Sequence, residues 1–249
     1  MQIQAIQTNL QEILPLRNLF LQENNFQIRY NAQHERGWSD SYLVMQNGEK
    51  IGYGSVSNID DKKSIFEFYI IPSFRNLTPL AFLELIHASK PSFIICQSND
   101  LLLLSLLFQF GQDINADTVL LEEDFTSSLY IDNVIFRRRN DDDNIFEHRA
   151  EPVGTYVLEF NNEVVATGGF LLHYNMPFAD LYMEVKEDFR RKGFGSFLIQ
   201  EIKKRCYIAG RVPAARTGLD NIASKATLIK AGFKVAGFML LGEVKSTKE

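Results

Sequence analysis

The chain carries the same strand–turn–strand pattern twice. Residues 42–54 and 156–168 share the order Tyr-x-x-x-x-Asn-x-Glu-x-Ile/Val-Gly/Ala-x-Gly. In each copy, apolar and β-branched residues flank a short segment that contains asparagine, a pattern typical of two antiparallel strands joined by a tight turn. The correspondence continues without gaps where residues 66–75 align with 181–190. A repeat of roughly half the chain predicts two domains of similar fold.

The elements that follow the hairpin also occur in both copies. Apolar spacing predicts helices at 80–87 and 194–204, and β-rich runs predict strands at 93–96 and 214–218. A second helix is expected in each copy: one is the leucine-rich run that ends at Phe110-Gly111, the other is led by Asn221 and ends at Gly232. The C-terminal copy then continues with a strand at 234–241.

The C-terminal copy also has a basic, glycine-containing loop at 190–196, Arg-Arg-Lys-Gly-Phe-Gly-Ser. The alternating run 179–185 predicts a strand before the loop, and apolar spacing predicts a helix after it. Gly193 and Gly195 permit positive φ and close backbone approach, and a helix N-terminus attracts anions. The loop therefore predicts a pyrophosphate cradle; the alternative is a tight turn with a solvated basic face.

The N-terminal copy lacks this chemistry. Thr78 and Leu80 stand opposite Gly193 and Gly195, and Pro79 removes a backbone N–H donor. Asn76 and Leu77 replace the two basic residues 191 and 192. The first domain is therefore predicted to bind no cofactor, and to pack against the second domain, complete its sheet or supply one wall of a substrate cleft.

Composition excludes several other functions. A net charge of -5 and a pI near 5.5 argue against nonspecific nucleic-acid binding. The basic run 137–139 is followed at once by the acidic run 141–143, which predicts a solvated loop. Cys96 and Cys206 have no nearby cysteine or histidine cluster, so both are expected to be buried free thiols without a disulfide or zinc.

No segment predicts export or membrane insertion. The apolar run 101–108 is too short to span a bilayer, and the N-terminus lacks the charged-then-apolar order of a signal peptide. The expectation is a cytoplasmic protein that binds neither nucleic acid nor membrane.

Over residues 150–245 the chain resembles the GNAT superfamily of acyl-CoA-dependent N-acyltransferases. The family loop Arg/Gln-x-x-Gly-x-Gly/Ala and the later Asn-x-x-Ser and Lys-x-Gly-Phe signals are matched by Arg190, Gly193, Gly195, Asn221, Ser224, Lys230, Gly232 and Phe233. The resemblance implies an α/β (α+β) fold of two tandem GNAT-like domains, each a mixed, mostly antiparallel twisted sheet flanked by helices. Residues 1–126 would form a degenerate domain, and 127–249 an acetyltransferase domain with splayed central strands and an acetyl-CoA site.

The function implied by this resemblance is transfer of an acetyl group from acetyl-CoA to a primary amine, by direct attack through a tetrahedral intermediate and without a metal. A backbone N–H at Val185 or its immediate neighbours would polarise the thioester. The residues expected to bind the cofactor are Met183, Val185, Arg190, Arg191, Lys192, Gly193, Phe194, Gly195, Ser196, Asn221 and Ser224.

The acceptor ammonium must lose a proton before it attacks. Glu184 is the first candidate base, ahead of Asp180, Tyr182 and His173; its alternative role is an exposed strand carboxylate or a substrate anchor. Many family members place a tyrosine acid where this chain has Leu228, which leaves solvent or Tyr207 for that task.

The sequence does not identify the amine, which is expected to be a small molecule or a peptide. The chain is also expected to be able to form a homodimer. Acidic residues and the aromatic residues Tyr156, Phe170, Tyr174, Phe178 and Tyr182 suggest a pocket for a cation. Because only the connector 127–151 precedes the second hairpin, part of the acceptor wall is expected from the first domain or a partner chain. The rival functions are a noncatalytic acyl-CoA sensor or interaction module, and a scaffold without a ligand.

Overall fold

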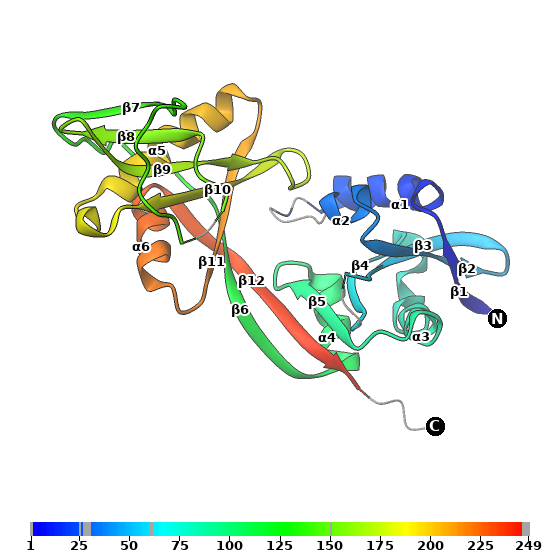
Figure 1. Cartoon of the computed structure of the whole chain (residues 1–249). Helices are drawn as coiled ribbons and strands as arrows, with labels where there is room; N and C mark the ends of the chain where they lie inside the picture. Colours follow the sequence, from blue (N-terminus) through cyan, green and yellow to red (C-terminus); the bar gives the residue numbers. More distant parts are fainter. Residues whose placement is uncertain (1, 25, 27–30, 60–61, 150, 246–249) are drawn as a thin grey trace. The chain divides into compact units, whose positions relative to one another are not determined.

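The computed structural model describes residues 2–24, 26, 31–59, 62–149 and 151–245 (Figure 1). These residues form two compact units. Unit 1 comprises the described residues up to Asp117 together with 237–245, and unit 2 comprises residues 118–236. Both units contain a mixed sheet flanked by helices, as predicted.

In unit 1 the strands lie in the order β1-β2-β3-β4-β5-β12. The pairings are antiparallel except for β4 with β5. Its elements are β1 (Ile3–Thr8), α1 (Leu10–Glu23), α2 (Asn31–Glu35), β2 (Ser39–Gln46), β3 (Glu49–Ser57), β4 (Ser64–Ile70), η1 (Pro72–Leu77), α3 (Thr78–Ser89), β5 (Phe93–Gln97), α4 (Leu101–Phe110) and the end of β12 (Phe233–Val244). One core packs α3 and α4 against the sheet through residues such as Phe68, Phe82 and Leu107, and a second packs α1 through Ile13 and Phe20.

In unit 2 the order is β6-β11-β10-β9-β8-β7, and only β10 with β11 is parallel. Its elements are the end of β6 (Gly111–Glu123), β7 (Val134–Arg138), β8 (Tyr156–Phe160), β9 (Glu163–Leu171), β10 (Phe178–Val185), η2 (Glu187–Phe189), α5 (Phe194–Ile208), β11 (Val212–Gly218), α6 (Ile222–Lys230) and the start of β12. The predicted solvated loop at 137–143 is wrong in part, since Arg137 lies in β7 and bonds Asp143 and Glu159.

Two strands are exchanged between the units. Strand β12 leaves unit 2 and pairs with β5 over Met239–Glu243, so a C-terminal segment completes the sheet of unit 1. Strand β6 leaves unit 1 and pairs with β11, from the pair Thr118 and Gly218 to the pair Glu122 and Ala214. The compact units therefore differ from a single division between residues 126 and 127, because each sheet uses one strand from the other half of the chain.

The structure reproduces the internal repeat in detail. The β2–β3 hairpin shifts register between Val44 and Met45, and the β8–β9 hairpin shifts at the aligned position, between Leu158 and Glu159. Both turns place asparagine in the left-handed region, with φ of 47° at Asn47. A shared bulge and a shared turn conformation support the alignment more strongly than the residue identities alone.

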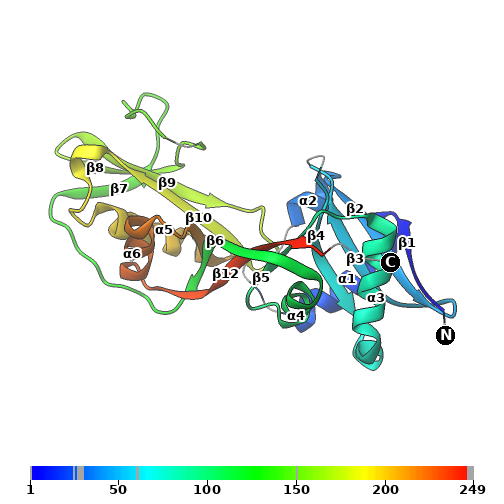
Figure 2. The same cartoon turned by 90° about the horizontal axis from the view of Figure 1, so that it is seen from below.

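Figure 2 shows most of the strands of both units labelled and seen from below. Both units separate their parallel strands after a short contact. In unit 2, β10 and β11 pair only up to Asp180–Ala214, although β10 continues to Val185 and β11 to Gly218. This is the splay that was predicted for the C-terminal copy. In unit 1, β4 and β5 pair only up to Ile65–Ile94.

Lys203 on α5 is buried where the end of β6 meets the start of β12. Its Nζ donates to the carbonyls of Phe125 (2.8 Å) and Ala231 (3.1 Å) and lies 3.1 Å from the Glu123 carboxylate. Replacing it with methionine is expected to lower the free energy of unfolding by about 2–3 kcal/mol, because these acceptors lose their donor. Its neighbour Lys204 is 54% exposed, so Lys204→Met should change stability by less than about 0.5 kcal/mol. Urea unfolding followed by circular dichroism measures both, and equal losses would contradict this role.

Both cysteines are free and buried, as the sequence predicts. Burial raises the pKa of each thiol, Cys96 and Cys206, to about 12. Because the thiolate is the reactive form, neither should react with an aromatic disulfide reagent at neutral pH in the native protein. Both should react after denaturation, and a fast-reacting native thiol would show that one of these sites opens.

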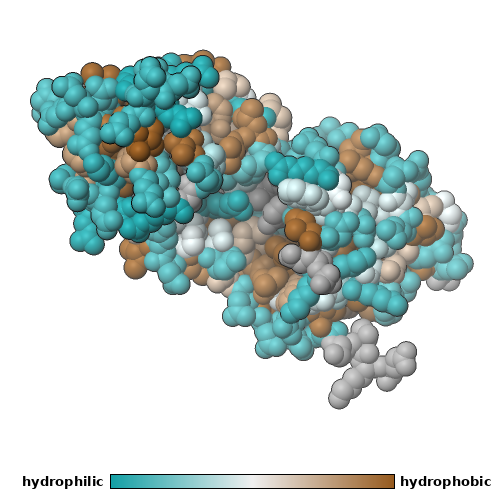
Figure 3. Space-filling model, viewed as in Figure 1, coloured by the Kyte–Doolittle hydropathy of each residue, from teal (hydrophilic) through white to brown (hydrophobic). Residues whose placement is uncertain are grey.

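Hydrophilic residues cover most of the surface visible in Figure 3. Among the described residues, no helix has both the length and the apolar character needed to cross a bilayer.

Candidate active site

The basic loop forms the N-terminus of α5 in unit 2. Gly193 is the N-cap residue with φ of 92°, and Arg191 also has positive φ, at 62°. The first helical hydrogen bond runs from Phe197 N to Gly193 O at 3.0 Å. The N–H groups of Phe194, Gly195 and Ser196 precede that bond, so they point out of the helix end toward an anion, as a cradle requires.

The two glycines are needed for different reasons. At Gly193 a Cβ would meet nothing closer than 3.8 Å, so the requirement is the positive φ. At Gly195, which lies inside α5, a Cβ would come 3.1 Å from the Thr227 side chain on α6 and 3.3 Å from the Val185 side chain on β10. The expectation that both glycines supply positive φ is therefore wrong for Gly195, whose small size lets α5 approach its neighbours.

The loop side chains mostly bind the protein itself. Arg190 Nε donates to Val185 O at 3.0 Å, and the Ser196 hydroxyl donates to Thr227 O at 3.1 Å. Phe194 is buried against the rings of Phe160 and Phe189. The loop thus offers an anion its backbone N–H groups, together with the exposed charges of residues 191 and 192.

Strand β10 directs backbone N–H groups into the splay. Lys186 N donates to Val165 O on β9. Backbone groups alternate in direction along a strand, so every second residue of β10, counted back from Lys186, also directs its N–H and C=O toward β9. Met183 and Val185 then direct theirs toward β11, which has already diverged. The bond from Arg190 to Val185 O agrees with this orientation. Val185 N–H therefore faces the gap between the strands, as its predicted role needs.

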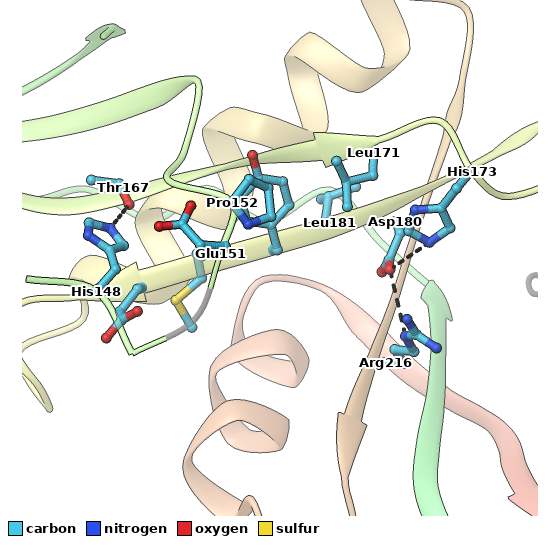
Figure 4. A pocket seen from close by; sticks show the side chains of 12 residues that line it. His148, Glu151, Pro152, Thr167, Leu171, His173, Asp180, Leu181 and Arg216 are labelled. Carbon is cyan, nitrogen blue, oxygen red and sulfur yellow. Dashed lines mark hydrogen bonds and ion pairs between the residues drawn. The ribbon is translucent and has the colours of Figure 1, made fainter. Parts of the chain in front are cut away.

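A cavity of about 280 Å³ opens on the opposite face of β10 from α5 (Figure 4). The side chains of Asp180, Tyr182 and Glu184 share that face, whereas Met183 and Val185 contact α5 at Gly195. The cavity is lined by His148, Glu151, Pro152, Thr167, Leu171, His173, Asp180, Leu181, Tyr182, Met183, Glu184 and Arg216. All of these residues belong to unit 2.

At one end of the cavity Glu184 holds the connector and the loop together. Its carboxylate oxygens accept from Arg149 N at 3.3 and 3.1 Å and lie 3.8 Å from Arg190 Nη2. His148 lies beside it, with Nδ1 2.8 Å from Phe146 O and Nε2 2.6 Å from the Thr167 hydroxyl. Because a carbonyl only accepts, Nδ1 carries a hydrogen.

At the other end Asp180 connects two strands. Its Oδ2 lies 3.2 Å from His173 Nε2 and 3.7 Å from Arg216 Nε on β11 (Figure 4). Asp180 is 8% exposed, so this carboxylate is shielded from water on most sides.

All four candidate bases line this cavity, although their roles remain predictions. Of the five aromatic residues expected in a cation pocket, Tyr182 alone lines the cavity, and burial raises its pKa. Tyr174 and Phe178 are instead buried in the core, and Tyr156 stacks on Phe136.

Sequence reasoning missed four polar lining residues: His148, Glu151, Thr167 and Arg216. The first two lie in the connector 127–151, whose shortness led to the expectation that part of the acceptor wall comes from the first domain or a partner chain. His148, Glu151 and Pro152, at the end of this connector and just after it, line the cavity. For Arg216 the available signal was a single charged residue in the middle of the predicted strand 214–218.

The second motif has a structural role on α6. Asn221 is the N-cap, and its side chain accepts from Ser224 N at 3.1 Å. Leu228 is buried, which is consistent with packing in place of an acid. Tyr207 lies near the far end of the 15-residue helix α5, about 20 Å from the helix start at about 1.5 Å per residue, so it is too distant to protonate a thiolate at the splay.

The corresponding loop of unit 1 leaves few backbone N–H groups free at the helix start. There η1 runs directly into α3, Thr78 N donates to Arg75 O, and the next residue is Pro79. The helix start therefore has few free donors for an anion.

A buried ionic cluster occupies the region of unit 1 that corresponds to the cavity. Glu67 aligns with Tyr182 and accepts two bonds from Arg17, both at 3.0 Å, one from Tyr53 at 3.0 Å and a contact from His34 at 3.1 Å. All four residues are at least nine-tenths buried. The Glu67 side chain is 2% exposed, so its carboxylate is not open to a substrate.

Two family models match the chain in sequence. One, described as an acetyltransferase (GNAT) domain, matches residues 9–124, and the other, described as the acetyltransferase (GNAT) family, matches residues 119–233. No curated protein matches the chain in sequence.

Solved structures of similar fold span the whole chain. A GNAT-family acetyltransferase from Colwellia psychrerythraea has a TM-score of 0.75 at 14% identity, covering 98% of this chain and 100% of that chain. A GCN5-related N-acetyltransferase from Sphaerobacter thermophilus has a TM-score of 0.63 at 13% identity, covering 99% and 97%. A tandem GNAT protein from the clavulanic acid biosynthesis pathway has a TM-score of 0.60 at 10% identity, covering 99% and 100%. At these identities the likeness concerns the fold, which agrees with the two matched domains. The chain is therefore a tandem GNAT protein, with two domains of the GNAT acetyltransferase family in one polypeptide.

Proposed function

We propose that unit 2 transfers an acetyl group from acetyl-CoA to a primary amine, and that unit 1 binds no cofactor. The observation that carries this proposal is the start of α5 beside the splayed strands, with free N–H groups on both. The helix N-terminus fits a pyrophosphate, and the splay fits an extended arm that pairs with β10. Acetyl-CoA supplies the activated acetyl group, and the chain supplies orientation and electrostatics.

In this proposal the N–H groups of Phe194, Gly195 and Ser196 hold the pyrophosphate, with charge from Arg191 and Lys192. Arg190 acts indirectly, because it holds the loop to β10 through Val185 O. The N–H of Val185 binds the arm, and the N–H of Met183, nearer to where β10 and β11 meet, polarises the thioester carbonyl. Asn221 and Ser224 contribute by fixing the start of α6 on the second wall of the splay.

The acceptor enters from the cavity. Its carboxylates, Glu151, Asp180 and Glu184, outnumber its single arginine, Arg216, which favours a cationic amine over an anion. A cavity of about 280 Å³ suits a small amine or the end of a peptide side chain.

A noncatalytic acyl-CoA sensor is the second candidate, and the buried Leu228 in place of a tyrosine acid favours it. The two functions differ in turnover, because both predict binding of acetyl-CoA.

Calorimetric titration with acetyl-CoA and with free CoA tests the proposal. One site per chain is expected, and two sites would contradict the assignment of unit 1. Release of free thiol in the presence of primary amines then distinguishes an enzyme from a sensor, and absence of acetyl-CoA binding would remove both candidates.

A further inference from the structure

We infer that His173, positioned by Asp180, accepts the proton of the acceptor ammonium, and that Glu184 does not. The inference rests on the proposed function and refines its chemistry. It follows from where each carboxylate lies along β10 and from what already occupies it.

Glu184 lies at the pyrophosphate end of the splay. It contacts Arg190, the first residue of the cradle loop, at 3.8 Å. The acyl end of an extended cofactor arm is its far end, so the thioester must lie away from this loop. A base beside the loop would therefore be distant from the reacting carbon.

Asp180 lies at the opposite end, where the strands meet. It is the last residue of β10 that pairs with β11, through Ala214, and it also pairs with Leu171 on β9. It lies four positions before Glu184 along β10, which corresponds to about 13 Å at about 3.3 Å per residue. An arm that starts at the cradle and follows β10 brings its thioester toward Asp180, within reach of the N–H of Met183.

The two carboxylates also differ in their partners. Both oxygens of Glu184 accept from Arg149 N, and Arg190 balances its charge. Glu184 thus anchors the connector that forms the cavity wall. Asp180 directs its Oδ2 to His173 Nε2 at 3.2 Å, and Arg216 Nε is farther away, at 3.7 Å.

The contact between His173 and Asp180 is an ion-pair distance: buried Nε2 lies 3.2 Å from Asp180 Oδ2 without forming a hydrogen bond to it. Asp180 thus places a negative charge directly beside the ring that takes the proton, which makes Asp180 a positioning residue.

In the proposed step, one proton moves from the acceptor ammonium to His173, and the freed nitrogen lone pair forms the N–C bond to the thioester carbon. The C–S bond breaks with its electron pair on sulfur, and a second proton leaves the nitrogen and ends on that sulfur. His173 returns its proton to water. The net change is one amide, one thiol and one released proton.

The test compares two nucleophiles. Straight-chain primary alkylamines are protonated at neutral pH and need a base, whereas hydroxylamine is already uncharged. With acetyl-CoA as donor, His173→Gln and Asp180→Asn should each lower kcat/KM for the best alkylamine by about 100-fold, the usual contribution of a general base. Turnover with hydroxylamine should change little. The Glu184→Gln variant should weaken both nucleophiles alike, because it loosens the cavity wall.

Matched controls are available in unit 1. His87→Gln changes a histidine that is 52% exposed, and Asp113→Asn changes an exposed aspartate; neither should alter turnover. Equal losses with both nucleophiles in His173→Gln would overturn the inference, as would an alkylamine-specific loss in Glu184→Gln. A chain that binds acetyl-CoA by calorimetry but acetylates no alkylamine would overturn it too. Failure to bind acetyl-CoA at all would instead overturn the proposed function on which the inference rests.

Discussion

Replacing Gly193 and Gly195 together with valine is expected to weaken acetyl-CoA binding by about 100-fold or more. Valine at position 193 is strained at φ of 92°, and its relaxation turns the first N–H groups of α5 away from the anion. Valine at 195 meets the Thr227 side chain and pushes α5 from its neighbours. Losing two charge-assisted hydrogen bonds of about 1.5–3 kcal/mol each accounts for at least this factor. Calorimetric titration measures it.

Gly210 offers a matched control at the other end of the same helix. Its φ is +70°, and a Cβ there would meet nothing within 4 Å. Gly210→Val introduces a similar backbone strain far from the cradle, so it should cost stability without weakening acetyl-CoA binding. If the double variant stays folded by circular dichroism and still binds acetyl-CoA like the unmodified chain, the cradle does not hold the cofactor.

The second large effect is expected in unit 1, on replacing Arg17 with methionine. Glu67 would remain buried with its main countercharge removed, and breaking a buried ion pair from one side costs about 3–5 kcal/mol. The thermal midpoint of this unit should fall by roughly 10 °C. Scanning calorimetry measures the shift.

The same cluster makes the stability of unit 1 depend on pH. Burial by itself would raise the pKa of Glu67, but the Arg17 charge and the hydrogen bond from His34 outweigh it and hold that pKa well below its usual range. Because the pKa of Glu67 is lower in the folded than in the unfolded chain, ionised Glu67 stabilises unit 1 at pH values above its unfolded pKa of about 4.3. This contribution to the free energy of unfolding is lost as the pH falls below that value toward the folded pKa. Glu67→Gln should remove this acid-sensitive component.

Arg75 is the matched control for Arg17, because it pairs with Glu23 in the same unit while 42% exposed. Arg75→Met should change the free energy of unfolding by no more than about 1 kcal/mol. Equal destabilisation by Arg17→Met and Arg75→Met would show that burial does not decide the strength of these pairs.

Local patterns in the sequence predicted most of the elements. The hairpins, the cradle loop and the capped helix at Asn221 depend on residues close in sequence, so periodicity and capping were sufficient. The exchange of β6 and β12 was not predictable, because their partners lie far along the chain: Ser98 N bonds Phe238 O. An apolar strand shows that it needs a partner without showing which one.

In the candidate site, too, the sequence predicted what depends on neighbouring residues and not what depends on distant ones. Strand alternation placed Asp180 and Glu184 on one face, but their order relative to the cofactor depends on the splay and on Arg149, which the connector brings to Glu184. Glu67 gave only the weak signal of one acid in an apolar strand, since Arg17 and His34 reach it from other elements. The acceptor, a homodimer and a cytoplasmic location stay predictions.

The exchanged strand β12 also constrains biosynthesis. Residues 237–244, which close the sheet of unit 1 against β5, leave the ribosome after every residue of unit 2 has been made. During translation β5 therefore remains an open edge that a chaperone must shield or a neighbouring nascent chain can capture. An N-terminal fragment expressed alone would expose that same edge, so dissecting the two domains requires grafting β12 onto β5 rather than cutting the chain.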